Sequence, residues 1–181
     1  ILLLLGGMPM FDAICVSLGT AGTGGFGNWN NSIAHYNSAY LQNVISVFMI
    51  LFGINFNAYF LLLTRKFKQL FKIEEIRVYL GVIAVFTLLA VGTVLLKATE
   101  DITWLGAFFQ SVSARTAGFS TYPIGQFTNA GLFTLCVLMF IGACAGSTGG
   151  GMKCSRILLL FKGVKKEMMS LIHPRLVRVH K

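Results

Sequence analysis

Long apolar stretches separated by short polar segments dominate this chain. Residues 13–64, 78–96 and 116–152 contain no Asp, Glu, Lys or Arg. A helix rises about 1.5 Å per residue, so about 20 apolar residues are needed to cross a hydrocarbon core of about 30 Å. The lengths of these stretches therefore predict an all-α membrane protein.

A five-residue phrase occurs twice, and its two copies are Thr23-Gly24-Gly25-Phe26-Gly27 and Thr116-Ala117-Gly118-Phe119-Ser120. Each copy follows a short apolar segment and precedes a polar loop and then a long uncharged run. In lipid, irregular backbone persists only where it is buried in protein or lines a water-filled path. Because rings of backbone loops form ion selectivity filters, the duplicated phrase predicts two loops that line an ion path.

The second copy predicts the layout of one repeat. Val78–Leu96 is expected to be a spanning helix, and Asp101 is a candidate N-cap for the next helix. Ile102–Ala114 is apolar but too short to cross, since about 13 residues make a helix of about 20 Å. This segment must therefore dip into the membrane and return through Thr116–Ser120. A second spanning helix is expected from Asn129 onward.

The first copy matches this layout. Ile1–Gly7 resembles the tail of a helix whose start is missing, and Pro9–Leu18 is the expected dipping segment. The chain would return through the first phrase, cross a polar outer loop at Asn28–Ser38, and span the membrane with Ala39–Thr64. The predicted fold is thus a repeated unit of helix, pore helix, filter loop and helix around a pore axis.

Gly25 and Gly118 occupy the same place in the two phrases. A loop that aims consecutive carbonyls at one point must alternate its backbone conformation, and glycine tolerates a positive φ. Carbonyl oxygens can then replace the water shell of a cation. An ordinary glycine-rich turn would explain one copy, but two copies in equivalent positions favour a filter.

The second helix of each repeat weakens at the same depth. The offset that superposes the two phenylalanines places Gly53 on Gly146, and Gly142–Gly151 is too rich in glycine to remain helical. A broken helix at membrane depth indicates an ion path or a moving part. The alternative is a helix-packing site, because Gly142–Gly146 also fits the small-xxx-small pattern.

Composition and charge agree with a membrane protein. The chain is 55% hydrophobic and 12% charged, and its mean hydropathy is +0.74. Its net charge of +9 comes from basic residues that gather in segments 65–77 and 153–181. By the positive-inside rule these segments are cytoplasmic, and both phrase loops lie toward the outside. The basic residues flank spans, which argues against nucleic-acid binding.

Four segments together resemble the Trk/Ktr superfamily of potassium transporters. They are residues 19–27, 113–121, 146–153 (Gly-Ser-Thr-Gly-Gly-Gly-Met-Lys) and 171–174 (Leu-Ile-His-Pro). Members of that family resemble four fused membrane–pore–membrane units around one pore. The sequence of residues 115–119, Arg-Thr-Ala-Gly-Phe, is more similar to the Ktr branch.

The resemblance implies that the chain holds the second and third units, without the first and fourth. Residues 1–64 would be the second unit without most of its first helix, and 65–77 a cytoplasmic linker. Residues 78–161 would be the third unit with a broken second helix, and 162–181 a cytoplasmic basic segment.

The resemblance also implies residue roles. The filter, which would bind K⁺ at its backbone, comprises Thr23, Gly24, Gly25, Phe26, Thr116, Ala117, Gly118 and Phe119. The gating loop comprises Gly142, Gly146, Ser147, Thr148, Gly149, Gly150, Gly151 and Lys153. K⁺ is the transported ion and no other cofactor is expected. The family works in the bacterial inner membrane as a homodimer on a cytoplasmic ring of nucleotide-binding regulatory subunits.

Two other classes of function are alternatives to a potassium pore. A phosphate-binding loop needs Gly-Lys-Ser/Thr, but Met152 separates Gly151 from Lys153, so an enzyme is not expected. A secondary transporter with rocking repeats, coupled to H⁺ or Na⁺, also uses broken helices and is the alternative. Asp12 could be a structural carboxylate or could concentrate cations at the outer mouth. Arg115 could pair within the scaffold or discourage anions.

Overall fold

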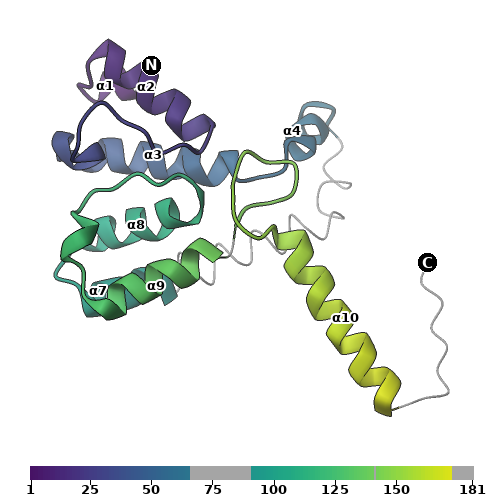
Figure 1. The fold of residues 1–181 in the computed structure, drawn as a ribbon. Helices are drawn as coiled ribbons and strands as arrows, with labels where there is room; N and C mark the ends of the chain where they lie inside the picture. Colours follow the sequence, from purple (N-terminus) through teal and green to yellow (C-terminus); the bar gives the residue numbers. More distant parts are fainter. Residues whose placement is uncertain (66–90, 141, 173–181) are drawn as a thin grey trace.

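The computed structural model describes residues 1–65, 91–140 and 142–172, and each regular element in these ranges is a helix (Figure 1). The elements are α1 (Leu2–Leu5), α2 (Met10–Ala21), η1 (Ser32–Tyr36), α3 (Ala39–Phe52), α4 (Phe56–Leu63), α7 (Val91–Thr99), α8 (Trp104–Thr116), η3 (Ile124–Gln126), α9 (Asn129–Phe140) and α10 (Cys154–Ile172). The expected segment from residue 78 therefore lies partly outside the described residues.

The helices form two similar units that lie against each other. In the first unit α1 and α2 pack against α3, and in the second α7 and α8 pack against α9 (Figure 1). The junction between the units is the contact of α3 with α8. α10 projects away from both units, as Figure 1 shows.

The two short helices, α2 and α8, begin and end differently from the expectation. The expected N-cap at Asp101 is wrong, because Thr103 caps α8 and its Oγ1 accepts a hydrogen bond of 3.1 Å from the Gly106 N–H. Thr103 has the extended backbone and the side-chain oxygen that an N-cap requires. At their C-terminal ends both helices continue beyond the expected Leu18 and Ala114.

The span expected as one helix over Ala39–Thr64 is broken. α3 ends at Phe52, α4 begins at Phe56, and the two helices are bent by 90°. Asn55 stabilises the new start, because its side chain accepts a hydrogen bond of 2.9 Å from the Asn57 N–H. The break therefore falls where the repeat offset placed Gly53 on Gly146.

Length and hydropathy alone do not identify a spanning helix here. Within the described ranges no single helix is both long and apolar enough to cross a membrane, and the α3–α4 pair qualifies only when its two parts are taken together. α2 and α9 are apolar but shorter.

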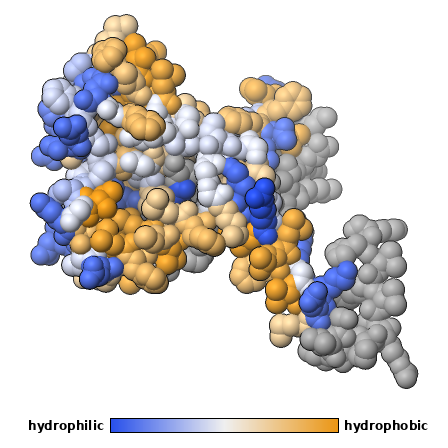
Figure 2. All heavy atoms as spheres, viewed as in Figure 1, coloured by the Kyte–Doolittle hydropathy of each residue, from blue (hydrophilic) through white to orange (hydrophobic). Residues whose placement is uncertain are grey.

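Both apolar and polar side chains are buried inside the two-unit body, and many large apolar side chains are exposed on its surface. Ser46, Gln110 and Ser113 are buried between helices. Large apolar side chains are exposed along the outer faces, including Phe11 and Phe133. Figure 2 shows these apolar faces in orange and hydrophilic residues gathered at the left edge, where the connecting loops lie. Exposed apolar faces of this extent are expected when lipid or further protein surrounds the helices.

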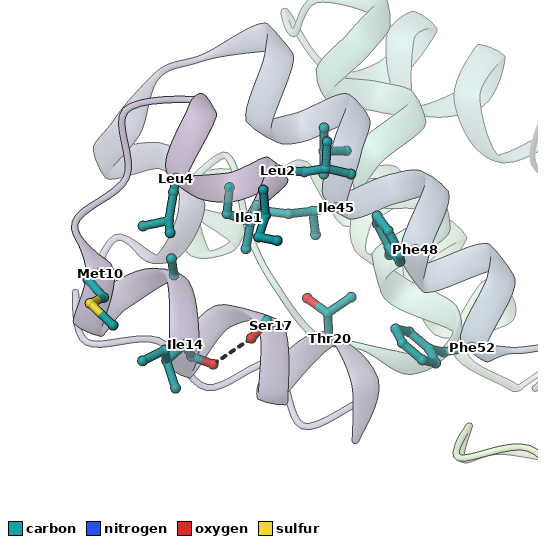
Figure 3. Close-up of a pocket in the computed structure, with 13 residues that line it drawn as sticks. Ile1, Leu2, Leu4, Met10, Ile14, Ser17, Thr20, Ile45, Phe48 and Phe52 are labelled. Carbon is teal, nitrogen blue, oxygen red and sulfur yellow. Dashed lines mark hydrogen bonds between the residues drawn. The ribbon is translucent and has the colours of Figure 1, made fainter.

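An apolar hollow of about 430 Å³ opens between α1, α2 and α3 (Figure 3). Its lining includes Ile14, Ile45 and Phe48 together with two hydroxyl groups. Those hydroxyls donate to backbone carbonyls of α2, Ser17 to Ile14 and Thr20 to Val16, over 2.9 and 2.7 Å. The lining therefore suits an apolar side chain or acyl chain rather than a polar ligand.

Candidate functional site

The two phrase loops meet backbone to backbone. A Cβ built on Gly25 would lie 2.1 Å from the Ala117 carbonyl oxygen and 2.8 Å from the carbonyl carbon of Gly118. A Cβ built on Gly118 would lie 3.9 Å from the Gly25 Cα. The two copies of the phrase, far apart in the sequence, therefore lie together in the structure.

Both glycines adopt the left-handed conformation. The φ angle is +68° at Gly25 and +79° at Gly118. The sequence predicted a positive φ at both positions. Thr23 also has a positive φ, +52°, which is uncommon for a β-branched residue. Such strain persists only where the surrounding structure holds the residue in place.

α8 and the outer loop of the first unit hold the second phrase in position. The Ser113 hydroxyl donates to the Phe119 carbonyl over 2.5 Å, and Gln110 Nε2 donates to Ser120 Oγ over 3.2 Å. The Ser120 carbonyl accepts a hydrogen bond of 3.1 Å from the Ile33 N–H. One lone pair of the Phe119 carbonyl is thus bonded to the scaffold.

A glycine-rich loop follows α9 and closes on itself. Residues 142–153 are not helical, as the glycine content predicted. The Gly142 N–H donates to the Met152 carbonyl over 3.1 Å, and the Met152 N–H donates to the Phe140 carbonyl over 3.2 Å. A Cβ on Gly142 would lie 2.1 Å from the Gly150 carbonyl oxygen, so the base of the loop tolerates only glycine there.

The body of this loop binds the break between α3 and α4. The Cys144 N–H donates to the Gly53 carbonyl, and the Phe56 N–H donates to the Gly146 carbonyl, each over 3.1 Å. These bonds satisfy backbone groups that the broken helix would otherwise leave unpaired. Equivalent weak points of the two repeats therefore pair with each other.

The tip of the loop touches the first phrase. Thr23 Oγ1 lies 2.8 Å from the Thr148 carbonyl oxygen, and it lies at the same distance from the Gly22 carbonyl oxygen. The hydroxyl has one proton, so it donates to these two carbonyls in turn or shares the proton between them. On the other side of the tip, Lys153 Nζ donates to the Gly149 carbonyl. The structure thus joins the predicted gating loop to the predicted filter.

Comparison with known proteins agrees with this architecture. A family model described as "TrkH: Cation transport protein" matches residues 5–100 and 58–181, which together include nearly the whole chain. The chain belongs to the TrkH cation transport family. It is an all-α membrane protein built from repeated helix units, as the sequence predicted.

Named relatives support the assignment. The "Trk system potassium uptake protein TrkH" of Escherichia coli (strain K12) is 40% identical over 181 residues, which cover 94% of this chain and 36% of that protein. The "Ktr system potassium uptake protein B" of Vibrio alginolyticus is 34% identical and covers 84% of this chain and 36% of that protein. The expected lean toward the Ktr branch is therefore not supported.

A solved structure has the same fold. The potassium transporter TrkH from Vibrio parahaemolyticus superposes with a TM-score of 0.85 and 33% sequence identity. The match covers 99% of this chain and 40% of that structure. This member of the TrkH family thus spans little more than a third of the curated relatives that it matches.

Asp12 connects α2 to the outer loop. Its carboxylate accepts hydrogen bonds from Asn28 Nδ2, from Trp29 Nε1 at 3.1 Å and from the Tyr36 hydroxyl. Burial and the Asp12 hydrogen bond raise the pKa of Tyr36 to about 12, so that hydroxyl remains a donor at physiological pH. These contacts favour a structural role for Asp12 over a role in concentrating cations at the outer mouth.

Arg115 lies in the last turn of α8 and is buried, with 7% of its surface exposed. A cation at this end of a helix is stabilised by the helix dipole. This position favours a scaffold role over a direct role at a solvent-filled mouth.

Two elements of the site could not be predicted from sequence. The Thr23–Thr148 contact joins residues of different repeats that share no motif, and the Ser113 anchor lies within an apolar helix pattern. The offset predicted that both second helices weaken at equivalent positions, but it gave no signal that the Gly53 break would pair with residues 144–146.

Proposed function

We propose that this chain supplies two adjacent filter loops and an intramembrane gate to a pore for K⁺ uptake. The observation that carries this proposal is the backbone contact of Gly25 with Gly118, both at positive φ, in equivalent places of two repeats. The potassium uptake names of the relatives support the choice of ion.

The filter would bind K⁺ through backbone carbonyls of residues 23–26 and 116–119. Such carbonyls replace the water shell of the ion as it enters. α2 ends at Ala21 and α8 ends at Thr116, so the C-terminal end of each short helix precedes a filter loop. The partial negative charge at these ends favours a cation at the same place.

The loop of residues 142–153 would be the gate. Its base is closed by backbone hydrogen bonds, its body is bound to the α3–α4 break, and its tip reaches Thr23. A loop with many accessible conformations, held by a few hydrogen bonds of about 1 kcal/mol each, can move between two positions at low cost.

The proposal also includes further pore units and a cytoplasmic regulator. Two loops form half of a four-sided ring, so further units of the same protein would complete the pore. α10 begins directly after the gate and is exposed along most of its length, so it offers a handle for a cytoplasmic regulator. We propose a homodimer in the bacterial inner membrane, bound to a nucleotide-binding ring.

The test is ion flux through the purified full-length protein in liposomes. We expect K⁺ to pass in preference to Na⁺, driven by the membrane potential alone. Absence of K⁺ flux in both the presence and absence of the regulator would contradict the proposal.

The alternative is a secondary transporter with rocking repeats. The paired breaks at Gly53 and Gly146 favour it, since such proteins place broken helices at the interface of two repeats. A fixed stoichiometry of K⁺ with H⁺ or Na⁺ in the same liposomes would select this alternative.

Replacing Thr23 with valine is expected to release the tip of the gate. The variant keeps the shape of the side chain but cannot donate to the Thr148 carbonyl, a net loss of about 0.5–1.5 kcal/mol. The ratio of closed to open gate should then fall by about two- to tenfold. Basal K⁺ flux in liposomes measures this change.

Thr23→Ser is the matched control, because it retains the hydroxyl and should retain the basal flux. If Thr23→Val changed the K⁺/Na⁺ ratio and left the basal flux unaltered, Thr23 would act in the filter alone.

A further inference from the structure

The short helix η1 binds the second filter loop, although it belongs to the outer loop of the first unit. The Ile33 N–H donates to the Ser120 carbonyl over 3.1 Å, and the Ser120 N–H donates to Ser32 Oγ over 3.3 Å. Both backbone groups of Ser120 are therefore bonded to the first unit. Because Ser120 directly follows Phe119, the last residue of the proposed second filter loop, η1 sets where that loop ends.

The other end of η1 is held by Asp12. The hydroxyl of Tyr36, the last residue of η1, donates to Asp12 Oδ2, and Trp29 Nε1 donates to the same oxygen over 3.1 Å. The His35 ring stacks on the Trp29 indole, with centroids 3.9 Å apart and planes inclined by 7°, which fixes the indole in its donating position. Asp12 is 8% exposed, so its carboxylate is directed at these donors rather than at solvent.

The backbone of η1 needs both attachments. A 3₁₀ helix of five residues is longer than most, since the geometry of its hydrogen bonds is poor. Its first residue, Ser32, and the residue that follows the helix, Asn37, have positive φ angles of +51° and +40°. Residues other than glycine keep such backbone angles only where neighbouring groups hold them. Loss of the Asp12 attachment is therefore expected to change the geometry at Ser120.

The second repeat makes the equivalent attachment without a charge. The offset that superposes the two phenylalanines places Trp29 on Tyr122. It places Asp12 on Leu105, so the sequence of the second repeat has no carboxylate at this position. The Tyr122 hydroxyl binds the start of its own short helix, since it lies 3.2 Å from Thr103 Oγ1 and accepts a hydrogen bond of 3.3 Å from the Thr103 N–H. A neutral pair thus ties the loop to the helix there, which favours positioning over attraction of cations as the role of Asp12.

We propose that Asp12 is a positioning residue for K⁺ selectivity: it fixes η1, and η1 holds the filter loop of the other repeat through Ser120. This inference rests on the proposed filter and adds to it a residue outside both repeated phrases. The Ser113 hydroxyl of α8 binds the Phe119 carbonyl over 2.5 Å. The second filter loop is thus held by α8 from its own unit and by η1, fixed by Asp12, from the first unit.

The test is Tyr36→Phe in the full-length protein, which removes one donor to Asp12 and leaves the net charge unchanged. We expect the K⁺/Na⁺ flux ratio in liposomes to fall by about two- to tenfold, because one lost hydrogen bond shifts the balance between a held and a displaced loop by that factor. Gel filtration should show a yield near that of the wild type. Trp29→Phe removes the second donor and should also lower the ratio.

Tyr40→Phe is the matched control. Tyr40 of α3 is 44% exposed, and its hydroxyl makes no hydrogen bond to the part of the chain that the structure describes, so the ratio should match that of the wild type. A double variant with Asp12→Asn and Tyr36→Phe should lower the ratio no further than Asp12→Asn alone, since both substitutions act on one contact.

An unchanged ratio in Tyr36→Phe and Trp29→Phe, where the wild type prefers K⁺, would overturn the inference and leave the proposed pore intact. A loss of yield without a change of ratio would overturn it as well, because the contacts would then only stabilise the fold. If Asp12→Asn alone lowered K⁺ flux, and high salt removed the difference, Asp12 would act as an attracting charge instead. A wild type without K⁺ preference would contradict the proposed function itself.

Discussion

Replacing Gly25 with alanine is expected to damage the filter more than replacing Gly118 with alanine. Both substitutions place a Cβ on a residue with positive φ, at a cost of about 1–2 kcal/mol. Only at Gly25 would the new Cβ also lie 2.1 Å from a backbone carbonyl oxygen, that of Ala117. Backbone cannot move aside as a flexible side chain can, so the two loops must separate.

The two variants should differ in kind as well as in size. Gly118→Ala should lower the K⁺/Na⁺ ratio in the full-length protein while expression stays near that of the wild type. Gly25→Ala should lower both the ratio and the yield of folded protein, measured by gel filtration and by ion flux in liposomes.

Gly27→Ala is the control for the loop. A Cβ there meets nothing within 4 Å, and its φ lies outside the left-handed region, so selectivity should remain unchanged. If Gly118→Ala left both the growth on limiting K⁺ and the Na⁺ sensitivity unaltered, Gly118 would not be a filter residue.

Deleting Gly149-Gly150-Gly151 is expected to raise K⁺ flux and to weaken its dependence on the regulatory subunit. The deletion removes the carbonyl that Lys153 Nζ binds and the glycine that contacts Gly142 at the base of the loop. With its base open, the loop cannot keep Thr148 against Thr23. Ion uptake into liposomes, with and without the regulator, measures both effects.

Gly150→Ala is the matched control for this deletion, because a Cβ at that position meets nothing within 4 Å. Its flux and its regulation should match those of the wild type. If the deletion left both quantities unaltered, the glycine run would serve only to pack helices, the alternative that the small-xxx-small pattern suggested.

Local chemistry explains which features were predictable. Helix, short helix, loop and helix follow from apolar length and from glycine position, because each depends on residues close in sequence. The wrong N-cap prediction at Asp101 also concerned local structure. The cap is Thr103, two residues beyond Asp101, and its side-chain oxygen accepts the Gly106 N–H. The prediction of one continuous helix over Ala39–Thr64 was wrong, because apolar length does not reveal where the backbone of another segment will bind.

By itself the sequence determined the all-helical membrane class, the repeat, the two positive-φ glycines and the non-helical run at 142–151. These depend on composition, periodicity and the conformational freedom of glycine. The tertiary structure alone decided the pairing of Gly53 with Cys144, the contact of Thr23 with Thr148 and the burial of Phe119 but not of Phe26. Each of these depends on which surfaces the two units bring together.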